Sequence, residues 1–221
     1  MSRELVTRLR RLDCCAVSDA IDKLRATGIA SSAVTGVPQQ SGTGRIAGLA
    51  VTVELGVGAP PAGSARHLGA AAIELSGPDN VIVVEQRTGV DAACWGGLLS
   101  LGAKVRGVAG LVADGPVRDI DEARSHDFPI FARSLTAHTA RGRIVEIATN
   151  EPVILWDVAV NPGDYVIADN SAVIFIQATE IEVILNAAEE IAAKEAAMAK
   201  ALLDGVPVSQ VMGSTYENLL K

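Results

Sequence analysis

The chain has 221 residues and a mass of 22.8 kDa, which is typical of one domain, and it is acidic, with a formal net charge of −7. Hydrophobic residues make up 49% of the sequence but aromatic residues only 3%, so we expect a core of Ala, Val, Ile and Leu. The densest basic group consists of Arg8, Arg10 and Arg11. It is too small to neutralise a phosphate backbone, so we do not expect a nucleic-acid-binding groove.

The chain begins with two expected helices. Amphipathic spacing predicts a charged helix over residues 2–12 and a second one over 17–27, with Ser18 near its start and Gly28 just past its end. The segment GVPQQSGTG, residues 36–44, is rich in turn-forming residues and is expected to be a loop.

Strands and helices then alternate. Strands are expected over residues 45–55, 81–86, 108–113 and 130–132. Helices are expected over residues 64–75, 96–105 and 119–125. Strands separated by helices of this length indicate β-α-β units and a largely parallel sheet.

The last third changes character. Closely spaced strands are expected over residues 143–147, 153–155, 164–169 and 173–177, which favours antiparallel additions to the same sheet. An Ala-rich helix is expected over residues 180–204, ended by Gly205 and Pro207. The sequence therefore predicts a single domain made of N-terminal helices (2–27), an α/β body (45–177) and a long C-terminal helix (180–204).

Targeting and redox signals favour a cytoplasmic protein. The opening residues contain no apolar stretch of the kind found in secretory signals. No run approaches the roughly 18 apolar residues that a membrane span needs, so no membrane association is expected. Three cysteines, two of them adjacent, do not form a disulfide framework.

Two loops follow consecutive strands of the predicted sheet. Their sequences are RTGVDAACWGGLL and DGPVRD. Because ligands bind beyond the carboxyl ends of parallel strands, and consecutive strands are usually neighbours, these loops are expected to face each other. The first offers Gly96 and Gly97 at a helix start, and the free backbone N–H groups of Leu98 and Leu99 behind them suit an anion.

The second loop adds charged side chains to this site. The planar fork of Arg118 matches a carboxylate, and Asp119 is a hard oxygen ligand for a cation. No C-x-x-C motif occurs and the three histidines are scattered, so no zinc site is evident. A lone carboxylate that takes its other ligands from water favours Mg²⁺ or Mn²⁺.

Structural roles for the same residues remain open. Asp119 and Glu122 resemble a capping pair for the following helix, worth about 1 kcal/mol, and residues 114–116 resemble a plain turn. His67, on an Ala-rich predicted helix, is more typical of packing than of catalysis. Cys94 is expected to be a small core residue, since no His or Lys is placed by the sequence to activate it.

Three segments together resemble the RraA-like family, which contains the 4-hydroxy-4-methyl-2-oxoglutarate/4-carboxy-4-hydroxy-2-oxoadipate aldolases. They are WGGLLSLGAKVRGVAGLVADGPVRD, VSDAIDKL and EEIAAKEAAMAKALLDGVPVSQVM. The most specific element is the glycine loop followed at a fixed distance by Arg-Asp. The resemblance implies an α/β fold of the swivelling β/β/α type, with a mixed sheet and flanking helices. It also implies a homotrimer or a dimer of trimers, with active sites between subunits.

The resemblance also implies a role for each site residue. Gly96, Gly97, Leu98 and Leu99 would hold the carboxylate of a pyruvyl group through their N–H groups. Arg118 would bind the substrate carbonyl and the enolate oxygen, and Asp119 would hold Mg²⁺ or Mn²⁺, mostly through water. A glutamate from a neighbouring subunit's C-terminal helix, best matched by Glu195, would complete the site. The chain departs from the family pattern at Gly97, where many of the aldolases carry Asp or Glu.

The function implied is a metal-dependent lyase that cleaves a small 2-oxo acid to pyruvate through an enolate. Its activity would resemble that of 4-hydroxy-4-methyl-2-oxoglutarate aldolase, with oxaloacetate decarboxylation as a side activity. Two alternatives remain: a lyase acting on an unrelated 2-oxo acid, and a non-catalytic protein-binding regulator of an RNA-processing endonuclease. Members of the regulator branch lack the aspartate that is present here as Asp119.

Overall fold

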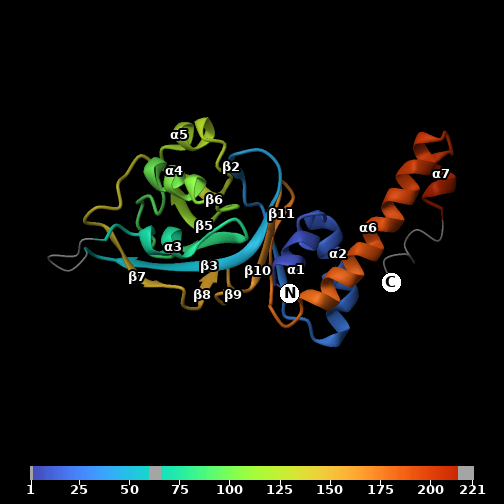
Figure 1. Cartoon of the computed structure of the whole chain (residues 1–221), viewed down its shortest axis with the longest axis horizontal. Helices are drawn as coiled ribbons and strands as arrows, with labels where there is room; N and C mark the ends of the chain where they lie inside the picture. The colour runs from blue at the N-terminus through green and yellow to red at the C-terminus, as the bar shows by residue number, and fades with distance from the viewer. Residues whose placement is uncertain (1, 60–65, 214–221) are drawn as a thin grey trace.

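A computed structural model describes residues 2–59 and 66–213 of the chain (Figure 1). The strands that the sequence patterns predicted as a parallel unit are β3 (Ile46–Val57), β4 (Asn80–Glu85), β5 (Gly110–Val117) and β6 (Ile130–Leu135). The added strands are β1 (Ser32–Thr35), β2 (Gln39–Ser41), β7 (Ile144–Thr149), β10 (Tyr165–Ala168) and β11 (Ala172–Ile176). Within the described residues these nine form one mixed, curled sheet, in the order β1-β11-β10-β3-β4-β5-β6-β2, with β7 also paired to β3.

The centre of the sheet is parallel, as the alternation of strands and helices predicts. β3, β4, β5 and β6 pair in parallel, with Val83 beside Val112 in the register of β4 and β5. The middle of β4 and most of β5 are buried on both faces, which explains why they appear in the sequence as continuous apolar runs.

The two faces of this parallel unit have different covers. Helices α3 (Ala70–Leu75), α4 (Gly97–Val105) and α5 (Ile120–Ser125) pack on one face through Ala72, Ala103 and Ala123. The other face meets a two-stranded hairpin of β8 (Val153–Leu155) and β9 (Val158–Val160). The small alanine side chains allow the helices to approach the sheet closely.

The antiparallel additions follow the predicted pattern. β10 and β7 both pair antiparallel to β3, the first through Leu49 and the second through Val53. β3 is long enough to hold both of them along one edge while its other edge pairs with β4.

A helical region occupies one end of the molecule (Figure 1). It contains α1 (Ser2–Leu9), α2 (Cys14–Leu24), the short 3₁₀ helix η1 (Arg25–Thr27), α6 (Ile181–Leu203) and α7 (Val208–Val211). Its core packs Leu9, Val17 and Ile184 against β10 and β11. Buried positions on α6 stop at Ile191, and the rest of the helix projects away from the body. It ends at Leu203, shortly before Gly205, whose φ is +88°.

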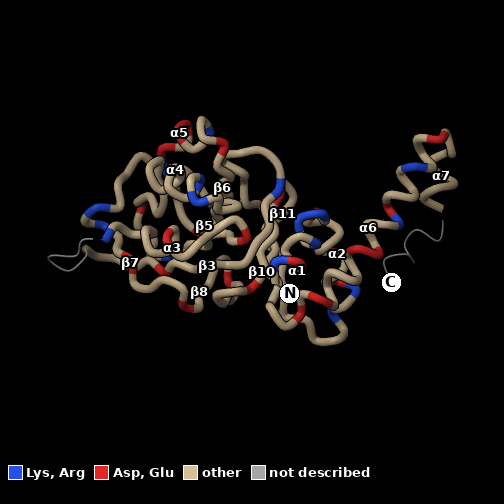
Figure 2. Tube along the Cα trace, viewed as in Figure 1, with Lys and Arg blue, Asp and Glu red and all other residues tan. Residues whose placement is uncertain are grey.

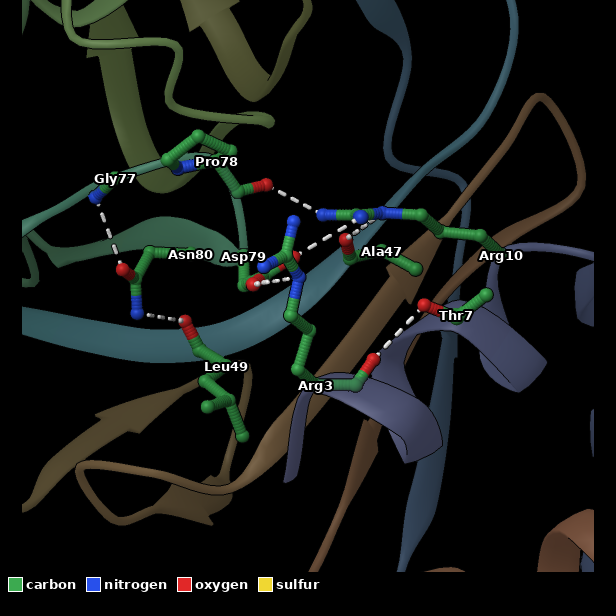
Figure 3. Close-up of polar contacts among 9 residues, drawn as sticks. All are labelled: Arg3, Thr7, Arg10, Ala47, Leu49, Gly77, Pro78, Asp79 and Asn80. Carbon is green, nitrogen blue, oxygen red and sulfur yellow. Dashed lines mark hydrogen bonds and ion pairs between the residues drawn. The ribbon is translucent and has the colours of Figure 1, made fainter. Parts of the chain in front are cut away.

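Arg3 of α1 and Arg10, which directly follows α1, fix the helical region to the sheet (Figure 3). Arg10 donates from Nε to the carbonyl oxygen of Ala47 at 3.2 Å and from Nη1 to Asp79 Oδ1 at 3.1 Å. A further bond from Arg10 reaches the carbonyl of Pro78, and Arg3 Nε lies 3.6 Å from Asp79 Oδ2. The loop before β4 is therefore held from both the sheet and the helical region.

Several local predictions were wrong. The expected loop over residues 36–44 contains β2, and β1 and β9 were not predicted, because these short strands are defined by pairing with distant segments. Asp13 rather than Ser18 caps α2, since its carboxylate accepts the N–H of Ala16 at 2.8 Å.

Two further corrections bear on the site. The turn expected at residues 114–116 is part of β5, which bulges there. The helix expected over 64–75 begins only at Ala70, so His67 lies on a loop; residues 64 and 65 fall outside the described residues.

Candidate active site

A cavity of about 290 Å³ opens beyond the carboxyl ends of β4 and β5. Six residues of the two loops were predicted from the sequence to form the site, and all of them line this cavity: Gly96, Gly97, Leu98, Leu99, Arg118 and Asp119. The two loops therefore face each other, because β4 and β5 are neighbouring parallel strands.

Backbone pairing between the loops sets their positions. The N–H of Cys94 donates to the carbonyl of Pro116 at 2.9 Å, and the N–H of Arg118 donates to the carbonyl of Trp95 at 3.0 Å. Trp95 is fully buried, and its indole N–H donates to Ser100 Oγ at 3.1 Å. The glycine loop is thus anchored to the core rather than free at the surface.

Asp119 bridges the two loops. Its Oδ2 accepts the N–H of Gly97, the first residue of α4, at 3.1 Å and lies 3.3 Å from Arg118 Nε. Asp119 has φ +54° and ψ +40°, a left-handed conformation that aspartate tolerates better than most residues. Its side chain makes no capping bond to α5, so the capping-pair interpretation is wrong: the carboxylate reaches α4 instead.

Several polar groups in the cavity lack partners among the described residues. No acceptor is present for the N–H groups of Leu98 and Leu99 or for the terminal nitrogens of Arg118. The N–H of Gly97 is already used by Asp119. An anion at the start of α4 would therefore meet two open N–H groups and the Arg118 fork.

The charges that line the cavity favour a cation beside such an anion. Asp119 and Glu122 contribute two negative charges and Arg118 one positive charge, which leaves a net charge of −1 before an anionic ligand enters. In the part of the chain that the structure describes, no group of three or more His, Cys, Asp or Glu side chains could hold a metal ion. The oxygen donors present fit Mg²⁺ or Mn²⁺, which take one or two carboxylates and complete their shell with water and substrate.

The cavity also contains residues that sequence reasoning did not assign to it. Glu122 and His67 both line it, with His67 Nδ1 2.8 Å from the carbonyl oxygen of Leu68. The spacing of Glu122, three residues after Asp119 at the start of a helix, was the available signal. Thr139 and Ala140 come from the segment after β6 and carried no local signal.

Glu195 does not reach the cavity of its own chain. It is exposed on α6, and this helix lies at the other end of the molecule from α4 and α5 (Figure 1). Partial burial, followed by the negative charges of Asp13 and Asp19, raises its pKa. Its predicted role in a neighbouring subunit's site stays a prediction.

Figure 2 shows Lys and Arg interspersed with Asp and Glu over the molecule. No helix within residues 2–59 and 66–213 is long and apolar enough to cross a membrane.

Comparisons with known proteins show which chains this one is similar to. A family model described as "RraA-like: Aldolase/RraA" matches residues 14–175. Protein DlpA of Legionella pneumophila is 27% identical over 202 residues, which cover 91% of this chain but only 32% of DlpA. A protein of Halalkalibacterium halodurans named "Putative 4-hydroxy-4-methyl-2-oxoglutarate aldolase" is 29% identical over 92% of this chain and 90% of its own length.

A solved structure supports the fold. RraAS2 of Streptomyces coelicolor, described as an unusual member of the RNase ES inhibitor RraA protein family, superposes with a TM-score of 0.75 and 26% identity. The match covers 87% of this chain and 94% of RraAS2. The mixed, curled sheet with flanking helices and a long C-terminal helix is thus the predicted fold.

Proposed function

Since the chain belongs to the RraA-like family, we propose that it is a divalent-metal-dependent lyase that releases pyruvate from a 2-oxo acid through an enolate. One observation carries this proposal: open N–H groups, the Arg118 fork and the Asp119 carboxylate converge on one cavity. A 2-oxo acid presents a carboxylate next to a carbonyl, which matches the two kinds of donor.

The candidate substrates follow from the relatives and from the chemistry. The name of the H. halodurans relative makes 4-hydroxy-4-methyl-2-oxoglutarate the first substrate to test. Cleavage of its C3–C4 bond leaves the electron pair on C3 as an enolate, while the C4 hydroxyl loses its proton and becomes the carbonyl of one pyruvate. The enolate then takes up a proton at C3 and becomes the second pyruvate. Oxaloacetate loses CO₂ and leaves the same three-carbon enolate, so its decarboxylation is proposed as a side activity.

Each residue has a distinct part in this reaction. The N–H groups of Leu98 and Leu99 bind the substrate carboxylate at the positive end of α4. Arg118 donates to the C2 oxygen, where negative charge grows as the bond breaks, and this stabilises the transition state more than the ground state. Asp119 would hold the cation, whose chemistry when bound is that of a Lewis acid for that same charge.

Self-association is part of the proposal. Leu98, Leu101 and Val105 expose 85%, 38% and 79% of their surface along one side of α4, next to the cavity. A homotrimer or a dimer of trimers would cover them, and the projecting α6 of a neighbour could then bring Glu195 to this site. Size-exclusion chromatography with light scattering tests this: the parent should be oligomeric, and Leu98→Asp should be smaller.

A protein-binding regulator without catalysis is the alternative that the similarity to RraAS2 favours. Such a regulator would bind its partner protein through the surface of the molecule. It would not need unpaired hydrogen-bond donors arranged in a cavity. Turnover distinguishes the two functions.

The test is pyruvate release from 4-hydroxy-4-methyl-2-oxoglutarate and from oxaloacetate, with added Mg²⁺ and with a chelator. We expect Mg²⁺-dependent release that Asp119→Asn abolishes. Asp121→Asn is the matched control, since Asp121 has a 94% exposed side chain that pairs with Arg124 outside the cavity.

Oxaloacetate with Mg²⁺ and no protein supplies the background rate. Equal release by the parent and Asp119→Asn, with both proteins folded and oligomeric, would contradict the proposal and favour the regulator.

A further inference from the structure

Position 97 is glycine for a steric reason rather than a conformational one. Gly97 does not have a positive φ, so any residue could adopt its backbone conformation. A Cβ at this position would overlap Glu122 Oε2 and lie 2.9 Å from Glu122 Cδ and 3.2 Å from Asp119 Cβ. The space that a side chain at 97 would need is thus filled by the carboxylate of Glu122.

Glu122 is an exposed residue, and no group in the described part of the chain holds its carboxylate in its position against Gly97. Among the described residues none forms a hydrogen bond or an ion pair with it, whereas its neighbour Asp121 pairs with Arg124 at 3.2 Å. Both acids lie in the first turn of α5, where their negative charges interact equally well with the helix dipole. Only Glu122 lines the cavity, so a dipole role does not account for its contact with Gly97.

The oxygens of Asp119 show what a second carboxylate would add. Oδ2 is occupied by the Gly97 N–H and lies beside Arg118, so only Oδ1 has no partner among the described residues. One free carboxylate oxygen next to a guanidinium is a weak site for a divalent cation. A second carboxylate restores the negative charge and accepts hydrogen bonds from the cation's waters.

We infer that Glu122 is the second carboxylate of this site, a positioning residue for the waters around the cation at Asp119, and that Gly97 is glycine because it makes room for it. This inference rests on the proposed function, because it concerns the same cation.

The first test is Mn²⁺ binding to the full-length protein, measured by isothermal titration calorimetry without substrate. Glu122→Gln keeps the shape of the side chain and removes its charge, and we expect about tenfold weaker Mn²⁺ binding, as for other residues that orient a metal's ligands. Asp121→Asn removes the same charge from the same turn of α5 and should bind Mn²⁺ like the parent.

A second test uses the steric contact. Gly97→Ala should push the Glu122 side chain aside and weaken Mn²⁺ binding about as much as Glu122→Gln does. In the Glu122→Gln background the same alanine should cause no further loss, because the group that it displaces no longer contributes. Gly102→Ala is the matched control within α4, since its Cβ would meet Ile73 only at 3.7 Å.

The outcomes separate this inference from the proposed function. Parent-like Mn²⁺ affinity in Glu122→Gln, together with loss of binding in Asp119→Asn, would overturn the role of Glu122 and leave the lyase proposal standing. Unchanged binding in both variants would overturn the two together. Thermal unfolding of each variant checks that a loss of affinity does not reflect a loss of fold.

Discussion

Two cavities open near the carboxyl end of β5, and they differ in how their charges are paired. The larger, of about 490 Å³, is lined by Arg87, Asp91, Asp114 and Arg133. Each of these charges has a partner: Arg87 lies 3.0 Å from Asp157, Asp91 lies 2.9 Å from His138, and Arg133 pairs with Asp114.

The cavity of about 290 Å³ contains fewer charges, yet Glu122, the terminal nitrogens of Arg118 and two helix N–H groups lack partners among the described residues. These groups are free to bind a ligand that enters the cavity, whereas the charges of the larger cavity are already paired with each other or with neighbouring side chains. The smaller cavity is therefore the candidate active site, and the larger one is structural.

The largest effect is expected at Arg118. Lysine keeps the charge but loses the planar fork, so Arg118→Lys should lower kcat/KM for pyruvate release about 100- to 1000-fold. Arg87→Lys, the same change in the larger cavity, should leave kcat/KM near the parent value. Similar rates for the two variants would remove the distinction between the cavities.

A smaller effect, on stability, is expected in the larger cavity. Asp114 is buried and accepts hydrogen bonds from Arg133 Nε at 2.7 Å and from the N–H of Trp156 at 2.8 Å. Arg133→Ala leaves that carboxylate without its counter-ion and uncovers the Trp156 ring, so the free energy of unfolding should fall by about 3 kcal/mol. Urea denaturation measures this. An unchanged stability with lost turnover would instead place catalysis in the larger cavity.

The smallest effect is expected at Asp91. The side-chain hydrogen bond with Thr136, and after it the one with His138, holds the pKa of Asp91 below its usual value. A lowered carboxyl pKa contributes stability at neutral pH that is lost as the pH falls below about 4. Asp91→Asn should therefore flatten the acid limb of the stability curve and leave turnover at pH 7 unchanged. An NMR titration that gives Asp91 an ordinary pKa would contradict this.

Sequence reasoning predicted the parts of the fold that local pattern determines. β4, β5 and α4 are continuous apolar or amphipathic segments; the predicted bounds of β4 and α4 were close, whereas β5 extends four residues beyond its predicted end. β1 was missed because its identity as a strand depends on pairing with β11, where Ser32 faces Phe175 across a separation of most of the chain. The site was predicted as far as it follows from two loops after neighbouring parallel strands.

The remaining part of the site depends on backbone and side-chain conformations that no local sequence pattern predicts. The left-handed backbone of Asp119 directs its carboxylate to α4, and the carboxylate of Glu122 lies against Gly97. Gly97 alone suggested a missing carboxylate, whereas the structure shows one from α5 in that space.

Enolate formation at this site is measured most directly by the exchange of the methyl protons of pyruvate in D₂O, followed by NMR. This exchange requires an enolate at this site and does not depend on knowing the complete substrate. We expect exchange that needs both the protein and Mg²⁺, persists in Asp121→Asn and is lost in Asp119→Asn. No exchange with the folded, Mg²⁺-loaded parent protein would contradict an enolate-forming site.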